Sequence, residues 1–166
     1  MGVPDDAKPR SAAEDEAALA RYAAELAAGI EAAVPGWVER SVADTYGAWA
    51  GRALPPDVQA QAAAAGRAAR AEVAPAVRAL LATDADAQRA NPLAILRAAV
   101  RHATTVLRTA GVPPVARDAE AERLFPDDLY DLGPAAFADV DPALHDAGIT
   151  WGAAKAHVVL QRRRRG

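Results

Sequence analysis

Apolar residues recur every three or four positions along most of the chain, the spacing that places them on one face of an α-helix. The pattern is clearest in residues 91–111. Asn91 is suited to capping a helix, Pro92 to its first turn and Gly111 to its end. We therefore expect one central helix here. The apolar positions of its buried face are Leu93, Ile95, Leu96, Ala99, Val100, Ala103, Val106, Leu107 and Ala110.

Residues 11–51 are predicted to form two helices. Ser11 and Glu14 have the spacing of a capping box, which marks the start of the first helix. Pro35 and Gly36 are expected to end it, because a proline lacks an amide hydrogen and crowds the preceding turn. The second helix begins at residue 37 or 38. Its inward line is predicted to be Val38, Val42, Thr45 and Trp49, with Tyr46 alongside.

Residues 56–83 carry a line of mostly small residues in which steps of three and four alternate. This spacing is typical of a helix that packs against a partner helix, and alanine at most positions requires the partner to come close. Pro75 is expected to kink the helix. The full line is Val58, Ala62, Ala65, Ala69, Val73, Ala76 and Leu80. We define the interaction seam as Ala62, Ala65, Ala69 and Val73.

After Gly111 the segments become short and are separated by proline and glycine. Gly148 is expected to end the last of the short turns, and Thr150 to cap a final helix. Single helical turns are predicted at residues 117–124, 126–132, 134–138 and 142–147. The residues that cover the core from these turns are predicted to be Leu124, Phe125, Leu129, Tyr130, Leu132, Phe137, Val140 and Leu144. Those that share a face of the final helix are Ile149, Ala153, Ala156 and Leu160.

The composition indicates the same fold class. Alanine, the strongest helix former, accounts for 47 of the 166 residues, while aromatic residues make up only 5%. We predict an all-α, alanine-rich helical bundle of about four long helices, followed by short helical turns and a C-terminal helix. We expect a single domain at residues 11–161, with a sub-boundary near residue 111 left open. Residues 1–10 are expected to be a disordered tip and residues 162–166 a basic tail.

Several functional classes are excluded or disfavoured. The absence of cysteine excludes disulfides, thiolate catalysis and cysteine-based zinc sites. The glycine motifs that bind phosphate and the HExxH zinc motif do not occur. No apolar run has the length of a transmembrane helix or the character of a signal peptide, so we expect a cytoplasmic protein without membrane contact. No cofactor is predicted.

Two histidines are candidates for chemistry. His102 lies at the edge of the central apolar arc, where a half-buried, hydrogen-bonded role is favoured over acid–base catalysis. His145 follows Asp141 by four residues, a spacing that suits two metal ligands. The EF-hand pattern fails there, because Ala143 and Leu144 stand where a ligand and a glycine are needed. We interpret the acids around His145 as caps and solvated residues, and we leave an enzyme open without favouring it.

Three arginines fall on the side of the central helix opposite its apolar arc. We call Arg97, Arg101 and Arg108 the arginine stripe. The stripe either docks on the acidic block at residues 118–146 or forms a phosphate-binding surface with the terminal arginines. In the first interpretation, Arg101 and Arg108 orient Asp127, Asp128 or Asp131. In the second, the binding residues also include Arg162, Arg163, Arg164 and Arg165.

The C-terminal half resembles a small uncharacterised family of helical proteins from high-GC bacteria. The resemblance rests on NPLAILRAAVRHATTVLRTAGVPPVARD, on FPDDLYDLGPAAFADVDPALHDAGITWGAAKAHV and on the terminal arginines. It implies no known activity and therefore no catalytic residue. Its most distinctive segments are residues 125–128, 137–139 and 151–152, where we would look for a functional site.

These observations leave one primary hypothesis and two others. The primary hypothesis is a non-catalytic interaction or regulatory protein that binds a protein partner, or itself, through the interaction seam. The alternative is a nucleic-acid-associated regulator that uses the arginine stripe and residues 162–165. An enzyme with a polar pocket at His102 or His145 is the third and least favoured.

Overall fold

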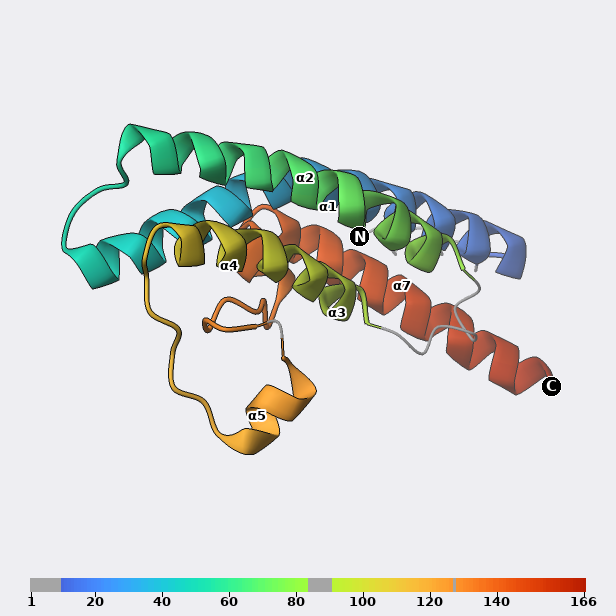
Figure 1. Cartoon of the computed structure of the whole chain (residues 1–166). Coiled ribbons are helices and arrows are strands. Elements are labelled where there is room, and N and C mark those ends of the chain that lie inside the picture. The colour runs from blue at the N-terminus through green and yellow to red at the C-terminus, as the bar shows by residue number, and fades with distance from the viewer. Residues whose placement is uncertain (1–9, 84–90, 127) are drawn as a thin grey trace, which may run out of the picture.

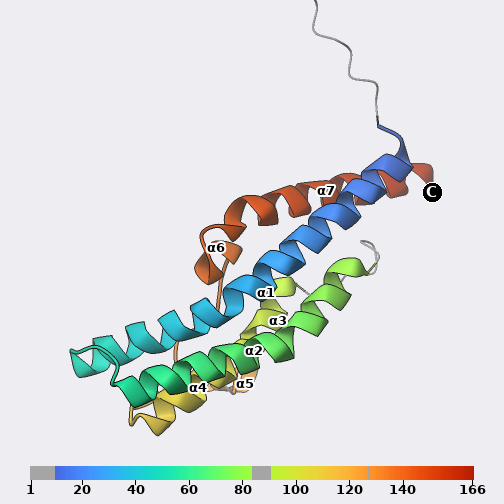
Figure 2. The same ribbon diagram turned by 90° about the horizontal axis from the view of Figure 1, so that it is seen from above.

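The computed structural model describes residues 10–83, 91–126 and 128–166, and the regular elements among them are all helical. Three long helices define the architecture: α1 (Ala12–Ala50), α2 (Pro56–Ala82) and α7 (Leu144–Arg165). Helix α1 lies between α2 and α7 (Figure 2). The shorter elements are α3 (Pro92–Leu96), the 3-10 turn η1 (Arg97–Ala99), α4 (Val100–Thr109), α5 (Ala119–Leu124) and α6 (Phe137–Val140) (Figure 1). The all-α prediction is confirmed.

Helix α1 begins as predicted but does not end at Pro35 and Gly36. The Ser11 hydroxyl accepts a hydrogen bond from the Glu14 amide at 3.3 Å, and the Glu14 carboxylate accepts one from the Ser11 amide at 2.6 Å. The helix then continues for 39 residues with Pro35 inside it. A proline in this position costs about 3 kcal/mol. Burial of the side chains on both sides of Pro35 offsets that cost. These side chains are Val34, Trp37 and Val38.

The C-terminal half of α1 buries a slightly different face from the one predicted. Val38, Val42 and Tyr46 are buried, as expected. Trp49 is 50% exposed, so its predicted inward position is wrong. Its ring meets the Tyr46 ring edge to face, with 5.8 Å between centroids. The buried line therefore follows steps of four residues and leaves Trp49 beside it.

Helix α2 packs tightly against α1. A Cβ added to Gly66 would lie 2.8 Å from the carbonyl oxygen of Pro35. Beyond Pro75 the buried residues are Val77 and Leu81, so the predicted positions Ala76 and Leu80 are wrong by one residue. From Ala69 onward the buried line continues in steps of four residues, through Val73, Val77 and Leu81, whereas the prediction took a step of three from Val73 to Ala76.

The central helical segment confirms its predicted ends. The side chain of Asn91 accepts a hydrogen bond from the Leu93 amide at 3.0 Å, and Gly111 has a φ of 85° where the helix stops. The segment is not one uninterrupted α-helix, because η1 tightens it where it packs against α2. Its fully buried apolar residues are Leu96, Ala99, Val100, Ala103, Val106 and Leu107.

Residues 112–126 and 128–140 connect α4 to α7; they include α5, which lies below the central segment in Figure 1, and α6, which lies beside α7 in Figure 2. Tyr130 anchors them: its side chain is buried and its hydroxyl donates to the Val112 carbonyl at 2.6 Å. Burial raises the pKa of the Tyr130 hydroxyl. Leu124 and Phe125 are exposed, so their predicted core positions are wrong. The reason is that α5 stands away from the other helices and buries none of its residues.

Helix α7 begins before its predicted start. It runs from Leu144 through Gly148 and Thr150, so the predicted stop and cap are wrong. Gly148 is helical and lies directly against the Phe137 ring, with which an added Cβ would overlap. The predicted shared face is solvent-exposed, and the face that contains Trp151 is buried instead. Both faces are apolar, and the tryptophan gives its own face the larger area to bury.

Some predictions concern the ends of the chain and the connectors. The predicted N-terminal tip, apart from Arg10, lies outside the described residues, as do residues 84–90 and residue 127. The terminal arginines at residues 162–165 belong to α7. In the described part of the chain, the helices lack an apolar stretch long enough to cross a bilayer.

Candidate functional site

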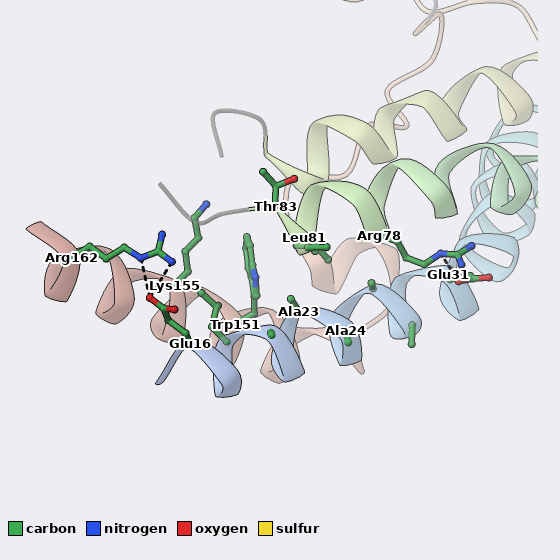
Figure 3. A pocket seen from close by; sticks show the side chains of 15 residues that line it. Glu16, Ala23, Ala24, Glu31, Arg78, Leu81, Thr83, Trp151, Lys155 and Arg162 are labelled. Atoms are coloured by element: carbon green, nitrogen blue, oxygen red, sulfur yellow. Dashed lines mark hydrogen bonds and ion pairs between the residues drawn. The ribbon is translucent and has the colours of Figure 1, made fainter. Parts of the chain in front are cut away.

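An open groove of about 540 Å³ lies between α1, α2 and α7. The N-terminal half of α1 forms its floor, the end of α2 one wall and α7 the other (Figure 3). Trp151 projects from α7 toward the end of α2, where Leu81 and Thr83 lie (Figure 3). The groove is therefore built by residues that are distant in sequence.

The floor of the groove is lined with alanine. Ala20, Ala24 and Ala28 are exposed at steps of four residues, so they form one line along α1. We call these three residues the alanine floor. The α1 residues of the groove extend from Glu16 to Glu31, about 22 Å at 1.5 Å per residue. A floor of small side chains lets the backbone of another helix approach closely.

Charged side chains border both ends of the groove. At one end, a guanidinium nitrogen of Arg162 lies 3.2 Å from a carboxylate oxygen of Glu16. At the other end, Nε of Arg78 lies 3.6 Å from a carboxylate oxygen of Glu31 (Figure 3). Between them, the Lys155 amine lies 5.2 Å from the centroid of the Trp151 ring. Three cations and two anions therefore surround an apolar floor.

Polar contacts fix α7 against α1 next to the groove. The carboxylate of Asp15, itself buried, accepts a hydrogen bond from the side-chain nitrogen Nε2 of Gln161 at 2.8 Å. The same oxygen lies 3.1 Å from Nε2 of His157. Just before α7 begins, Arg40 of α1 donates to the carbonyl of Val140, the last residue of α6, at 2.5 Å. These contacts hold the C-terminal end of α7 and the neighbouring α6 against α1.

Sequence reasoning did not single out this groove. The buried residues of this half of α1 include Ala23, Leu26 and Ile30, and the alanine floor lies beside them, where the sequence is that of an ordinary solvent-facing helix. The available signal was a second, parallel line of alanines at residues 20, 24 and 28. The line is available to pack closely against another helix because α2 diverges from α1 there, and the divergence is evident only from the structure.

The interaction seam is occupied by the chain itself. Ala62, Ala69 and Val73 are almost fully buried, and Ala65 is half-buried. All of them belong to the same core as the buried line of α1. The partner helix that the alanines require is therefore α1. A second protein could use the seam only by displacing it.

The arginine stripe is divided between two internal contacts. Arg97 forms an ion pair with Asp128 and lies 3.7 Å above the Phe125 ring. Arg101 instead pairs with Glu72 of α2, so the prediction that it orients an acid of the 118–146 block is wrong. The stripe does dock on that block, but through Arg97. Arg108 is exposed.

Asp128 is the most buried acid of this region, with 6% of its surface exposed. One carboxylate oxygen contacts Arg97 and lies 3.6 Å from Arg117. The other has no hydrogen-bond partner among the described residues. Burial raises the pKa of Asp128, although both arginines act to lower it. The arrangement fixes residues 112–132 to the central segment.

The terminal arginines lie far from the stripe. Arg163, Arg164 and Arg165 are exposed at the end of α7, at the opposite end of the molecule from α4 (Figures 1 and 2). The two groups therefore do not form one continuous basic surface. The predicted surface of seven arginines does not occur in this arrangement.

The histidines occupy the structural positions that were favoured for them. His102 is half-buried, and its Nε2 lies 2.5 Å from a carboxylate oxygen of Glu72. His145 is exposed, while neighbouring Asp141 accepts a hydrogen bond from the Ala143 amide at 2.9 Å. Asp139 accepts bonds from two amides before α6. Among the described residues, no group of three acids or histidines is arranged to hold a metal ion.

Two residues that the sequence had singled out, Trp151 and Arg162, line the groove, whereas the interaction seam, the arginine stripe and the histidines at 102 and 145 lie outside it. The resemblance of residues 91–165 to a family from high-GC bacteria stays a prediction. Comparison of the chain with protein-family models, with curated proteins and with solved structures finds no match.

Proposed function

We propose that this chain is a non-catalytic interaction protein that binds a helix of a protein partner in the groove between α1, α2 and α7. The observation that carries the proposal is the exposed alanine floor between two walls. A groove of this kind accepts an amphipathic helix through small and apolar contacts. Its length of about 22 Å corresponds to about four helical turns.

The charges at the groove specify the partner further. Glu16 and Glu31 each have an arginine partner in the lining, whereas Lys155 lies over an aromatic ring. The surplus charge of the lining is therefore one cation. We infer that the partner helix has a small apolar face flanked by an acidic residue that lies opposite Lys155.

A displayed library of amphipathic helices, selected against the intact chain, tests this function. Ala24→Arg places a long charged side chain on the floor and is expected to weaken binding of the selected peptides at least about tenfold. Ala64→Arg is the matched control, because Ala64 is an exposed alanine of α2 outside the groove. It is expected to leave binding unchanged.

Two results would overturn the proposal. One is selection of peptides whose binding is indifferent to Ala24→Arg. The other is a combination of three observations: the wild-type chain binds the dye 1-anilinonaphthalene-8-sulfonate, Ala24→Arg abolishes dye binding, and no helical peptide binds. The second result would assign the groove to a small apolar anion instead.

The alternative function, nucleic-acid binding, now depends chiefly on Arg163, Arg164 and Arg165, because Arg97, Arg101 and Arg162 form ion pairs with acids of this chain. Fluorescence anisotropy of mixed-sequence DNA and RNA, at low and physiological salt, tests it against a chain that ends at Leu160. Salt-sensitive binding that the truncation abolishes would make it the primary function.

A further inference from the structure

The outer face of α7 is an exposed apolar line. Ile149 and Leu160 are 58% and 53% exposed, and Ala153 and Ala156 between them are exposed as well. Their spacing of four, three and four residues places them in one row along the helix. Helix α7 forms an outer edge of the molecule (Figure 2). Trp151, which lines the groove, lies on the opposite side of α7, so the row belongs to a different surface.

Charges flank this row in a self-complementary order. Asp146 lies near the start of α7 and Arg164 near its end. About five turns of 3.6 residues separate them, so both lie on the same flank of the row. His145 and Arg163 are separated by the same number of turns and both lie on the other flank of the row. All four side chains are exposed.

We propose that α7 pairs with α7 of a second copy of this chain, antiparallel, about a two-fold axis midway between Ala153 and Ala156. Such an interface is isologous: each contact occurs twice. Ile149 contacts Leu160 of the second copy. Ala153 contacts Ala156 of the second copy, and these small residues let the two helices approach closely at the axis.

The charges select this arrangement over the others. In the antiparallel pair, Asp146 lies opposite Arg164 of the second copy at both ends of the interface. A parallel pair would instead place Arg163 and Arg164 opposite the same arginines of the second copy, and like charges in this position destabilise an interface. An anionic membrane surface would attract the arginines but repel Asp146. The pairing leaves Trp151 and Lys155 at the groove, so it does not rest on the proposed function.

The oligomeric state of the intact chain tests the interface. We expect sedimentation equilibrium to show a dimer at micromolar concentrations and a monomer for Ile149→Arg. Leu124→Arg is the matched control, because Leu124 is 55% exposed on α5, away from α7. It is expected to remain dimeric. A wild-type chain that is monomeric at high micromolar concentration, or a dimer that Ile149→Arg leaves intact, overturns the proposal.

A charge exchange tests the antiparallel register. Asp146→Arg and Arg164→Asp are each expected to weaken the dimer roughly tenfold at low salt, because each replaces two attractions by two repulsions. The double variant is expected to recover the affinity of the wild type. Failure to recover, with the circular dichroism of the helices unchanged, overturns the register. Binding of a monomeric chain to phosphatidylserine vesicles would assign the row to a membrane instead.

Discussion

Gly66 of α2 faces Pro35 of α1 at backbone distance. A Cβ at Gly66 would lie 2.8 Å from the Pro35 carbonyl oxygen and 3.0 Å from its Cα. Both atoms belong to the backbone, so no side chain can rotate to make room. The pair therefore sets how closely the two longest helices approach.

Gly66→Ala is expected to destabilise the fold by about 1–3 kcal/mol, because the added methyl group forces α1 and α2 apart. The measurement is urea denaturation followed by circular dichroism. Gly47→Ala is the control: Gly47 is also helical, and an added Cβ there lies 3.7 Å from its nearest neighbour, the Arg52 carbonyl oxygen. We expect the control to stabilise by about 0.5–1 kcal/mol. Equal effects of the two substitutions would contradict the tight contact.

Local features of the fold were predictable from the sequence, because their causes lie within a few residues. The capping box at Ser11, the cap at Asn91 and the stop at Gly111 each depend on one or two side chains and one turn of backbone. The buried face of the central segment follows from the helical period alone. These predictions are confirmed.

The remaining features depend on contacts between distant segments. The local chemistry of Pro35 favours the end of a helix. Helix α1 nevertheless continues, because the rest of the fold buries Val34 and Trp37. For α7, the helical period identified two apolar faces without saying which one is buried. The groove was not predictable for the same reason: its floor and walls come from three helices.

Thr104 offers a test of core energetics. It is 3% exposed, and its hydroxyl has no hydrogen-bond partner among the described residues. Thr104→Val keeps the shape and removes an unsatisfied polar group, so we expect it to stabilise the fold by about 1 kcal/mol. Thr105→Val is the control, because the Thr105 hydroxyl is exposed and donates to the Arg101 carbonyl at 2.9 Å. If Thr104→Val is less stable than the wild type, the Thr104 hydroxyl must have a hydrogen-bond partner in solution.

Substitutions of two arginines of the stripe should distinguish an ion pair that stabilises the fold from an exposed surface pair. Arg97→Ala removes the ion pair with buried Asp128 and the stacking on Phe125, so we expect a loss of about 2 kcal/mol. Arg101→Ala removes an exposed pair with Glu72 and should cost at most about 1 kcal/mol.

Hydrogen exchange locates the effect of Arg97→Ala. The Val115 amide donates to the Leu129 carbonyl at 3.1 Å within the segment that Asp128 fixes to the central helices. Its protection is expected to fall in Arg97→Ala and to persist in Arg101→Ala. Equal protection in both variants would mean that Tyr130 alone holds the segment.

The acid dependence of stability tests the cluster around Glu72. A hydrogen bond from His102, helped by the charge of Arg101, holds the pKa of Glu72 below its usual 4.5, although burial acts in the opposite direction. A carboxyl group whose pKa is lowered by folding adds stability above its unfolded pKa. That stability is lost as the pH falls through the folded pKa. Glu72 should therefore stabilise the fold fully at neutral pH and progressively less below pH 4.5.

We expect Glu72→Gln to be less stable than the wild type at neutral pH by under about 1 kcal/mol, since the pair is exposed to solvent. The gap should narrow as the pH falls below 4.5. Urea midpoints across this range measure the gap. The difference between the two proteins is the informative quantity, because Asp128 contributes the opposite slope: burial raises its pKa, so its ionisation lowers stability as the pH rises. A gap that stays constant through the acid range would mean that folding leaves the pKa of Glu72 unchanged, so that the contact with His102 does not depend on the ionisation of Glu72.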